Sequence, residues 1–117
     1  MHTDNKITGK IGEELATKYL QDKGYQIIKR NWGNKWGEID IIARLKNITI
    51  FIEVKTKIGE DWGSPEEMVN KRKLFQVQRM ASTYDKIRPC QSRIDVIAVV
   101  LNEDLTVKRI NHYEAVY

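Results

Sequence analysis

Apolar residues recur at helical spacing near the start of the chain. Ile11, Leu15 and Tyr19 are each four residues apart, and Gly24 follows at a position typical of a helix end. This pattern predicts a first helix over residues 8–23. A second helix is predicted to start at the Ser-Pro-Glu-Glu segment of residues 64–67, which combines an N-cap serine, a first-turn proline and a capping-box glutamate. It is predicted to run to about residue 85.

Short segments rich in branched apolar residues predict five strands. They cover residues 25–30, 38–45, 48–57, 93–101 and 105–110. Residues 31–37 are rich in turn-forming residues and are predicted to form a loop. The order helix, three strands, helix, two strands predicts an α/β fold, with a mixed central sheet of about five strands flanked by two helices. No linker interrupts this order, so residues 1–117 are predicted to form one domain.

The two central strands form a predicted hairpin with one charged face. A two-residue turn at positions 46–47 places Asp40 opposite Glu53 and Glu38 opposite Lys55. The core face is predicted to carry the apolar positions Ile39, Ile41, Ala43, Ile50, Ile52 and Val54.

Two acids directly opposite each other in a sheet repel, and the repulsion calls for compensation. A divalent cation held by Asp40 and Glu53 would supply it. Lys55, on the same face, could then orient water or stabilise charge during phosphodiester hydrolysis. The alternative is a surface cluster in which Lys55 neutralises Glu38 and Glu53.

Glu13 lies on the apolar side of the first predicted helix. It shares a stripe with Gly9, Ala16 and Leu20, whereas Glu14 lies on the polar side. Small residues at positions 9, 12 and 16 would let this helix approach the sheet closely. Glu13 is therefore expected near the charged face of the hairpin, the alternative being a solvated glutamate favoured by the helix dipole.

Lys73 occupies the same kind of position on the second predicted helix. It lies in a stripe formed by Val69, Val77, Met80 and Tyr84. Such a lysine either extends its amine to solvent or pairs with acids or a phosphate at the hairpin.

Composition narrows the class of protein. The 117 residues are 41% apolar and 31% charged, which is typical of a globular chain. Lysine and arginine exceed the acids by 20 to 16, which favours a polyanionic partner. One cysteine and two histidines cannot form a zinc cluster or an internal disulfide. No apolar run reaches the roughly 20 residues of a membrane span and the first residues lack a signal core, so a cytoplasmic location is expected.

Several short motifs occur together in one order. They are Gly9-x-x-Gly12-Glu13-x-x-Ala16, Gly24-Tyr25, Arg30-Asn31, Gly37-Glu38-Ile39-Asp40, Glu53-Val54-Lys55-Thr56, Lys73 and Arg93-Ile94-Asp95. In this combination the chain resembles the YraN-like protein family. That family is similar to the restriction-endonuclease-like superfamily, named for its PD-(D/E)xK motif, and to the archaeal Holliday-junction resolvases.

The resemblance implies a restriction-endonuclease-like core and specific roles for five side chains. Asp40 and Glu53 would bind Mg²⁺ or Mn²⁺ with the backbone carbonyl of Val54. Glu13 would be a third acidic group, at the metal and in catalysis, Lys55 the catalytic lysine, and Lys73 a further catalytic group. Lys57 stands where the family usually has arginine, and Ile94 where it usually has phenylalanine; the first departure bears on phosphate contacts, the second on core packing.

These features predict a metal-dependent endonuclease that hydrolyses DNA phosphodiesters, with branched or recombination intermediates as candidate substrates. The alternative is a nucleic-acid-binding or assembly module that keeps the fold without catalysis. Trp32, Lys35 and Trp36 are candidates for contact with unpaired bases and phosphates, although a tryptophan could instead pack in the core. The resolvase resemblance also suggests a homodimer, because two related sites can cut two strands symmetrically.

Overall fold

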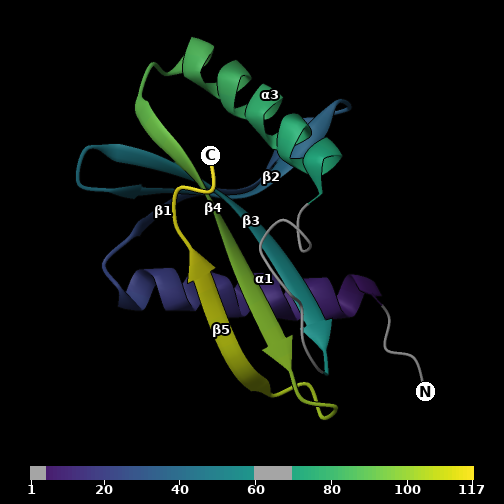
Figure 1. The fold of residues 1–117 in the computed structure, drawn as a ribbon. Coiled ribbons are helices and arrows are strands. Elements are labelled where there is room, and N and C mark those ends of the chain that lie inside the picture. Colours follow the sequence, from purple (N-terminus) through teal and green to yellow (C-terminus); the bar gives the residue numbers. More distant parts are fainter. Residues whose placement is uncertain (1–4, 60–69) are drawn as a thin grey trace.

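A computed structural model describes residues 5–59 and 70–117 of the chain. Figure 1 shows the elements formed by these residues, which are α1 (Asn5–Asp22), β1 (Gln26–Asn34), β2 (Gly37–Leu45), β3 (Ile48–Ile58), α3 (Lys71–Ile87), β4 (Gln91–Leu101) and β5 (Val107–Tyr113). The predicted order of helices and strands is confirmed, and the fold is α/β. Within these residues no helix is long and apolar enough to span a membrane.

The five strands form one mixed sheet in the order β1-β2-β3-β4-β5. β3 and β4 run parallel, and the other neighbouring pairs are antiparallel. A parallel pair needs a long crossover, and the segment between β3 and β4 that contains α3 provides it. Ile41 pairs with Ile52 and Ala43 with Ile50, so the predicted register of the β2–β3 hairpin is confirmed.

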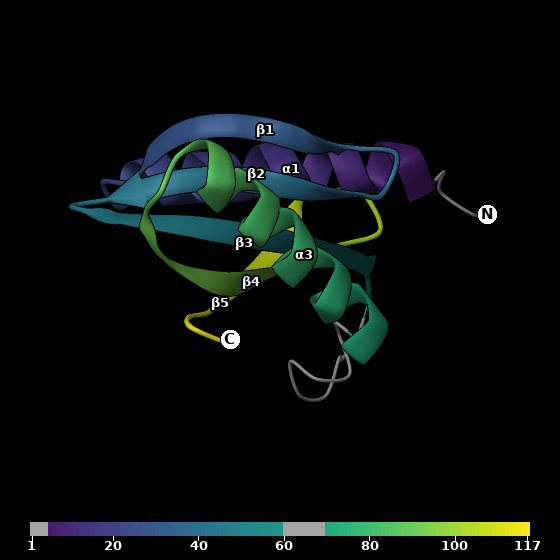
Figure 2. The ribbon, with the colours of Figure 1, turned by 90° about the horizontal axis from the view of Figure 1, so that it is seen from above.

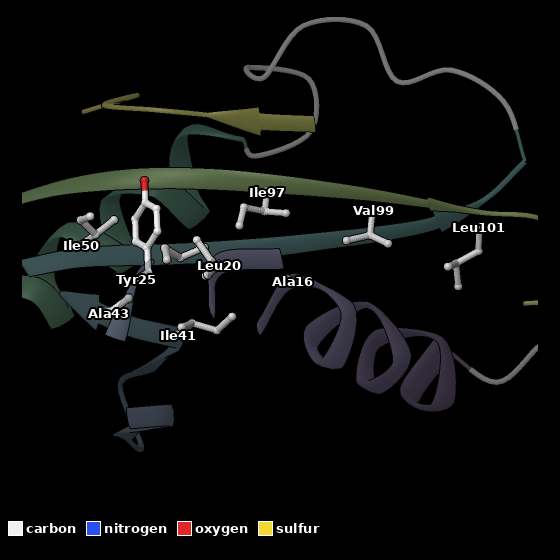
Figure 3. Packing of buried hydrophobic residues seen from close by; sticks show 10 residues of the cluster. Ala16, Leu20, Tyr25, Ile41, Ala43, Ile50, Ile97, Val99 and Leu101 are labelled. Atoms are coloured by element: carbon white, nitrogen blue, oxygen red, sulfur yellow. The ribbon is translucent and has the colours of Figure 1, made fainter. Parts of the chain in front are cut away.

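The helices cover opposite faces of the sheet (Figure 2). Ala16 and Leu20 of α1 are fully buried against one face, and Figure 3 shows the apolar side chains of the sheet around them. Val77, Met80 and Tyr84 of α3 cover the other face. Both surfaces of the central strands are therefore buried, which explains their nearly continuous apolar sequences.

The second helix was predicted to run unbroken from about residue 64, and this is wrong at Asn70. That residue has an extended conformation, with φ −70° and ψ 166°, and its side chain accepts a hydrogen bond of 2.9 Å from the Lys73 N–H. Asn70 thereby satisfies an N–H that the first turn of a helix leaves without a partner, and α3 begins at Lys71. The predicted start at residues 64–67 lies outside the described residues.

Residues 31–37 were predicted to form a loop, and this is confirmed only for the two-residue turn at 35–36. β1 continues to Asn34, with Trp32 paired to Ile39 and Gly33 to Glu38. A side chain at Gly33 could not be accommodated, because its Cβ would lie 2.1 Å from the Gly37 carbonyl oxygen. Turn-forming residues suggested a loop, but Gly33 is needed here for a different reason, which is that it lets the two strands of a tight hairpin approach closely.

The other strand boundaries differ by a few residues from those predicted. β4 begins at Gln91, and β5 begins at Val107 and continues to Tyr113. Leu105, expected in the last strand, lies in the preceding turn with φ 70°. Its N–H donates to the Asn102 carbonyl at 2.9 Å, so a local turn takes the place of the expected strand pairing.

Candidate active site

The β2–β3 ladder ends at the pair Ile41–Ile52. Beyond it β3 continues to pair with β4, while β2 continues to pair with β1. The Val54 N–H, on the side of β3 that β2 has left, donates a hydrogen bond of 2.8 Å to Oδ2 of Asp40. The Asp40 carboxylate thus replaces a strand as the partner of this N–H, at the point where β2 and β3 stop pairing.

Asp40 and Glu53 are both buried and lie next to each other. Asp40 is 9% exposed and Glu53 is 6% exposed. Burial raises the pKa of Asp40 most, and the hydrogen bond to Glu53 and the charge of Glu53 raise it further, to about 8. The Val54 N–H and the Lys73 charge oppose this increase in pKa only in part. Without a cation, the site therefore favours a protonated Asp40.

Lys73 joins the acids from the face covered by α3. Its Nζ lies 3.2 Å from Oε2 of Glu53, and its side chain is 38% exposed. The inward direction predicted for Lys73 is thus observed, and its amine remains open to solvent on one side. An ammonium in this position can pair with a carboxylate or with a phosphate that approaches from outside.

Glu13 approaches from α1 on the opposite face of the sheet. Its Oε1 accepts a hydrogen bond of 2.9 Å from Nδ2 of Asn31 and lies 3.9 Å from the Arg30 guanidinium. Burial raises the pKa of Glu13 most, the Asn31 hydrogen bond lowers it, and the charge of Asp40 raises it again. Glu14 is exposed and pairs with Arg30 at 2.7 Å, in agreement with its predicted place on the polar side.

Glu38 is influenced by the same charges. Burial raises its pKa most, followed by the charges of Asp40 and Glu13, while Lys73 lowers it. Four acids therefore share one region, and Glu38 is its exposed member. The predicted pairing of Glu38 with Lys55 is wrong, because the β2–β3 ladder has already ended and Glu38 pairs with Gly33 of β1.

Close packing of α1 on β3 brings Glu13 to the sheet. A Cβ on Gly12 would lie 1.7 Å from Oγ1 of Thr56, so only glycine permits this approach. Ala16 is fully buried one turn later. Gly9 was predicted to contribute as well, but no atom lies within 4 Å of where its Cβ would stand, so that prediction is wrong.

The core face of the hairpin also differs from the prediction at one residue. Ile39 packs in the cluster covered by α3, whereas Ile41 packs in the cluster covered by α1. At this point the β1–β2 ladder pairs Arg30 with Ile41 and Trp32 with Ile39 in one register, and Asp40 and Asn31 between them form no ladder pair. Ile39 and Ile41 therefore face opposite sides of the sheet, with Asp40 between them.

Lys55 lies two residues beyond Glu53 on β3 and is exposed. Alternation along the strand places both on the face of the sheet that α3 covers. Lys57, two residues further, is exposed as well. Val54, between Glu53 and Lys55, is partly buried against the α1 cluster, and its carbonyl is the backbone oxygen implied as a ligand by the family resemblance.

The candidate nucleic-acid contacts fall into two groups. Trp32 is partly buried and packs edge-on against Tyr84, with ring centroids 5.3 Å apart. Trp36 is 64% exposed, and Nζ of Lys35 lies 5.1 Å from its ring centroid. Lys35 and Trp36 are the exposed members of this trio.

The chemistry of Asp40 and Glu53 fits a hard divalent cation. Mg²⁺ commonly binds through one or two carboxylates and completes its coordination with water or substrate oxygens. Over residues 5–59 and 70–117, no three histidine, cysteine, aspartate or glutamate side chains form a group that could hold a metal. Asp40 and Glu53 lie together as a pair, and Glu13 lies outside any three-residue group among these residues.

Arg30 and Asn31 were not assigned a role from their chemistry in the sequence. Both hold Glu13, and Nε of Arg30 is a buried atom without a hydrogen-bond partner among the described residues. The sequence indicates only that Glu13 should have polar partners of this kind, because a glutamate that points inward needs them. Which strand supplies those partners depends on the sheet order.

Comparisons with known proteins agree on one family. Residues 12–99 match the model described as "Uncharacterised protein family UPF0102". A UPF0102 protein of Caldanaerobacter subterraneus subsp. tengcongensis is 40% identical over 113 residues, covering 93% of both chains. A UPF0102 protein of Clostridium botulinum strain 657 is 44% identical over 106 residues, covering 87% of this chain and 86% of the relative. One of Pelotomaculum thermopropionicum is 35% identical over 112 residues, covering 93% of both.

Proposed function

The chain belongs to the UPF0102 family, and we propose that it is a metal-dependent endonuclease hydrolysing DNA phosphodiester bonds. The observation that carries the proposal is the buried pair Asp40 and Glu53 at the end of the β2–β3 ladder. Burying two adjacent carboxylates is costly unless a cation compensates for their charge. A fold maintained without a ligand would be more stable with neutral side chains in these positions.

In this proposal some side chains bind the metal and others contact the water and the phosphate. Asp40 and Glu53 hold Mg²⁺ or Mn²⁺, with the Val54 carbonyl as a further candidate ligand. When bound, the cation polarises a phosphoryl oxygen and acidifies a water molecule. Lys55, exposed and on the same face as Glu53, orients the attacking water or stabilises charge on the phosphate. Lys73 keeps Glu53 in place and faces solvent, where it can meet a substrate phosphate.

The restriction-endonuclease-like resemblance supports the same assignment. The motif residues Asp40, Glu53 and Lys55 lie on two adjacent strands. Their order and spacing match the PD-(D/E)xK pattern, and they occur where the two strands stop pairing. DNA is the proposed substrate, with branched molecules among the forms to be tested.

Cleavage assays test the proposal directly. Labelled single-stranded, duplex, flap and four-way-junction DNA are incubated with the protein and Mg²⁺ or Mn²⁺. Lys55→Ala is expected to abolish cleavage while leaving Tm unchanged, because Lys55 is exposed. Lys46→Ala, in the exposed β2–β3 turn, is the matched control and should retain cleavage. Cleavage that persists in Lys55→Ala would contradict the assigned role.

A second candidate function rests on the Glu53–Lys73 ion pair of 3.2 Å, which already neutralises one of the two acids. A nucleic-acid-binding or assembly module would keep this pair and bind no metal. Isothermal titration with Mn²⁺ separates the two candidates. Binding that is lost in Asp40→Asn favours the nuclease, and no binding to the wild-type protein favours the module.

A further inference from the structure

α3 and the β1–β2 turn together form a groove of about 520 Å³. Among the described residues that line it are Trp36, Arg72, Lys73, Phe75, Gln76 and Arg79. They include three cations and no acid, and two of them are exposed aromatic side chains. The groove therefore differs in charge from the acidic site beside it.

Two aromatic side chains in the groove are exposed to solvent, which is energetically unfavourable. Trp36 is 64% exposed and Phe75 is 60% exposed, although large apolar side chains on a surface lose the benefit of burial. On α3 the positions Arg72, Phe75 and Arg79 are three and four residues apart, so they share one helical face. Along the groove, that face therefore presents a cation, an aromatic ring and a second cation in order.

The turn that carries Trp36 is held against α3. Nε2 of Gln76 donates to the Trp36 carbonyl at 3.1 Å, and the Trp36 N–H donates to Oδ1 of Asn34 at 2.8 Å. Gly37 makes the contact possible, because a Cβ there would lie 2.8 Å from Cγ of Gln76. The groove is thus built by specific contacts between two elements.

We propose that this groove binds a single nucleic-acid strand, with unpaired bases stacked on Trp36 and Phe75 and phosphates paired with Arg72 and Arg79. The inference deepens the proposed nuclease function and rests on it for the nature of the ligand. Exposed aromatic faces bind unpaired bases without regard to sequence, whereas the bases of a duplex are already stacked on each other. Arginine pairs with phosphate through two parallel hydrogen bonds.

Lys73 connects the groove to the acidic site. It lines the groove, and its Nζ lies 3.2 Å from Glu53. A strand lying in the groove would therefore pass beside the Asp40–Glu53 pair. The substrate class that fits this arrangement has an unpaired segment next to the bond to be cut, as in flaps, overhangs and branched molecules.

Fluorescence anisotropy in EDTA, where no cleavage occurs, tests the groove. The probes are a fluorescein-labelled single-stranded oligodeoxynucleotide and its blunt duplex. Wild-type protein is expected to bind the single strand more tightly. Trp36→Ala and Phe75→Ala should each weaken that binding by about fivefold or more and leave duplex binding unchanged. Ile87→Ala is the matched control, since Ile87 is 66% exposed on α3 outside the groove.

Salt dependence tests the two arginines. Arg72→Gln and Arg79→Gln should each reduce the slope of log affinity against log salt by about 0.7 for the single strand. Arg88→Gln, just after α3 and exposed, should leave the slope unchanged. Equal wild-type affinity for both probes, or unchanged single-strand affinity in both aromatic variants, would overturn the inference. A common Tm across these surface variants shows that folding is intact.

The outcomes separate this inference from the proposed function. If the binding results hold but wild-type protein cuts none of the DNA substrates with Mg²⁺ or Mn²⁺, the groove stands and the nuclease proposal fails. If wild-type protein cuts DNA, and Trp36→Ala and Phe75→Ala bind and cut DNA as well as wild type does, the nuclease proposal is supported. The proposal that the groove binds a single strand is then contradicted.

Discussion

Asp40 combines two properties that are rarely found together in a stable core. It is 9% exposed, and its carboxylate is hydrogen-bonded to Val54 while lying against a second acid, Glu53. The raised pKa of Asp40 measures the cost of charging it there. This cost makes the metal-free protein sensitive to pH and gives a route to detect metal binding without measuring catalysis.

We expect Asp40→Asn to stabilise the metal-free protein, increasingly so from pH 4 to pH 8. The folded-state pKa of about 8 lies above the ordinary aspartate value of 3.8, so folding takes up a proton between these limits and stability falls as pH rises. Asparagine resembles the protonated acid and avoids this loss. At pH 8 the gain should be at least about 1 kcal/mol, or roughly 4 °C in Tm.

Thermal unfolding in EDTA across this pH range measures the effect. Asp22→Asn, 66% exposed on α1, is the control and should behave as wild type. A second series with Mn²⁺ should raise the wild-type Tm and leave Asp40→Asn unchanged, because ligand binding to the folded state stabilises it. A stability difference that shrinks as pH rises would contradict the assignment.

Glu13 and Glu14 form a natural matched pair. Glu13 lies within the electrostatic reach of Asp40, whereas Glu14 is exposed and pairs only with Arg30 among the described residues. For the proposed nuclease, Glu13→Gln should reduce Mn²⁺ affinity by about tenfold, because it removes a negative charge that acts on Asp40. Glu14→Gln should leave this affinity unchanged. Equal effects of the two variants would remove Glu13 from the site.

At the scale of elements, the position of α1 depends on one glycine, Gly12, which has no side chain to block the contact with β3. Gly12 lets the helix contact Thr56 of β3 directly, and this brings Glu13 over the end of the β2–β3 ladder. α3 uses a different device on the other face, where Gly37 allows the β1–β2 turn to contact Gln76 and Met80. Each helix is thus placed by a glycine that removes a steric barrier.

Alanine at Gly12 should destabilise the protein by about 1–3 kcal/mol, because its Cβ would overlap Thr56 and force the helix outward. Alanine at Gly9 should stabilise it by up to about 1 kcal/mol, since that site is open and alanine is the better helix former. Urea denaturation of the two variants measures both changes. Thr56→Ala should restore part of the stability lost in Gly12→Ala.

At the scale of the whole molecule, a buried polar network links the end of the chain to the core of the sheet. Asp95 of β4 is fully buried and accepts hydrogen bonds from His112 at 2.7 Å, from Arg93 at 3.0 Å and from the Ala115 N–H at 2.8 Å. Tyr19 of α1 contacts the other ring nitrogen of His112 at 3.2 Å. One carboxylate thereby connects α1, β4, β5 and the residues after β5.

Asp95→Asn should destabilise the protein by about 1–3 kcal/mol at pH 7, because a neutral amide cannot replace the fully buried carboxylate that accepts hydrogen bonds from Arg93, His112 and the Ala115 N–H. Burial raises the pKa of Asp95, but hydrogen bonds from His112 and Arg93 outweigh it and hold the pKa below 3.8. The stabilisation is therefore complete above pH 4 and is lost as pH falls through the lower folded-state pKa. The difference between wild type and Asp95→Asn should accordingly shrink in acid.

Chemical denaturation from pH 7 down to pH 3 measures this convergence. Glu103→Gln, exposed in the β4–β5 turn, is the control and should track wild type throughout. A gap between wild type and Asp95→Asn that stays constant with pH would show that the charge of Asp95 contributes nothing.

The sequence alone determined the order of elements, the register of the β2–β3 hairpin and the adjacency of Asp40 to Glu53. These depend on local patterns: a two-residue turn sets the pairing, and apolar alternation selects the buried face. It also indicated that Glu13 and Lys73 point inward, because helical periodicity orients a side chain relative to its own helix.

Only the tertiary structure decided how those pieces meet. Where the β2–β3 ladder ends, why Ile39 changes face and which residues hold Glu13 all depend on strands that are distant in the sequence. The groove between Trp36 and Phe75 likewise requires a hairpin and a helix to dock. Periodicity in the sequence indicates the faces of one helix or strand. The end of a ladder, a close contact at a glycine and a shared groove depend on how two or more elements are placed relative to each other.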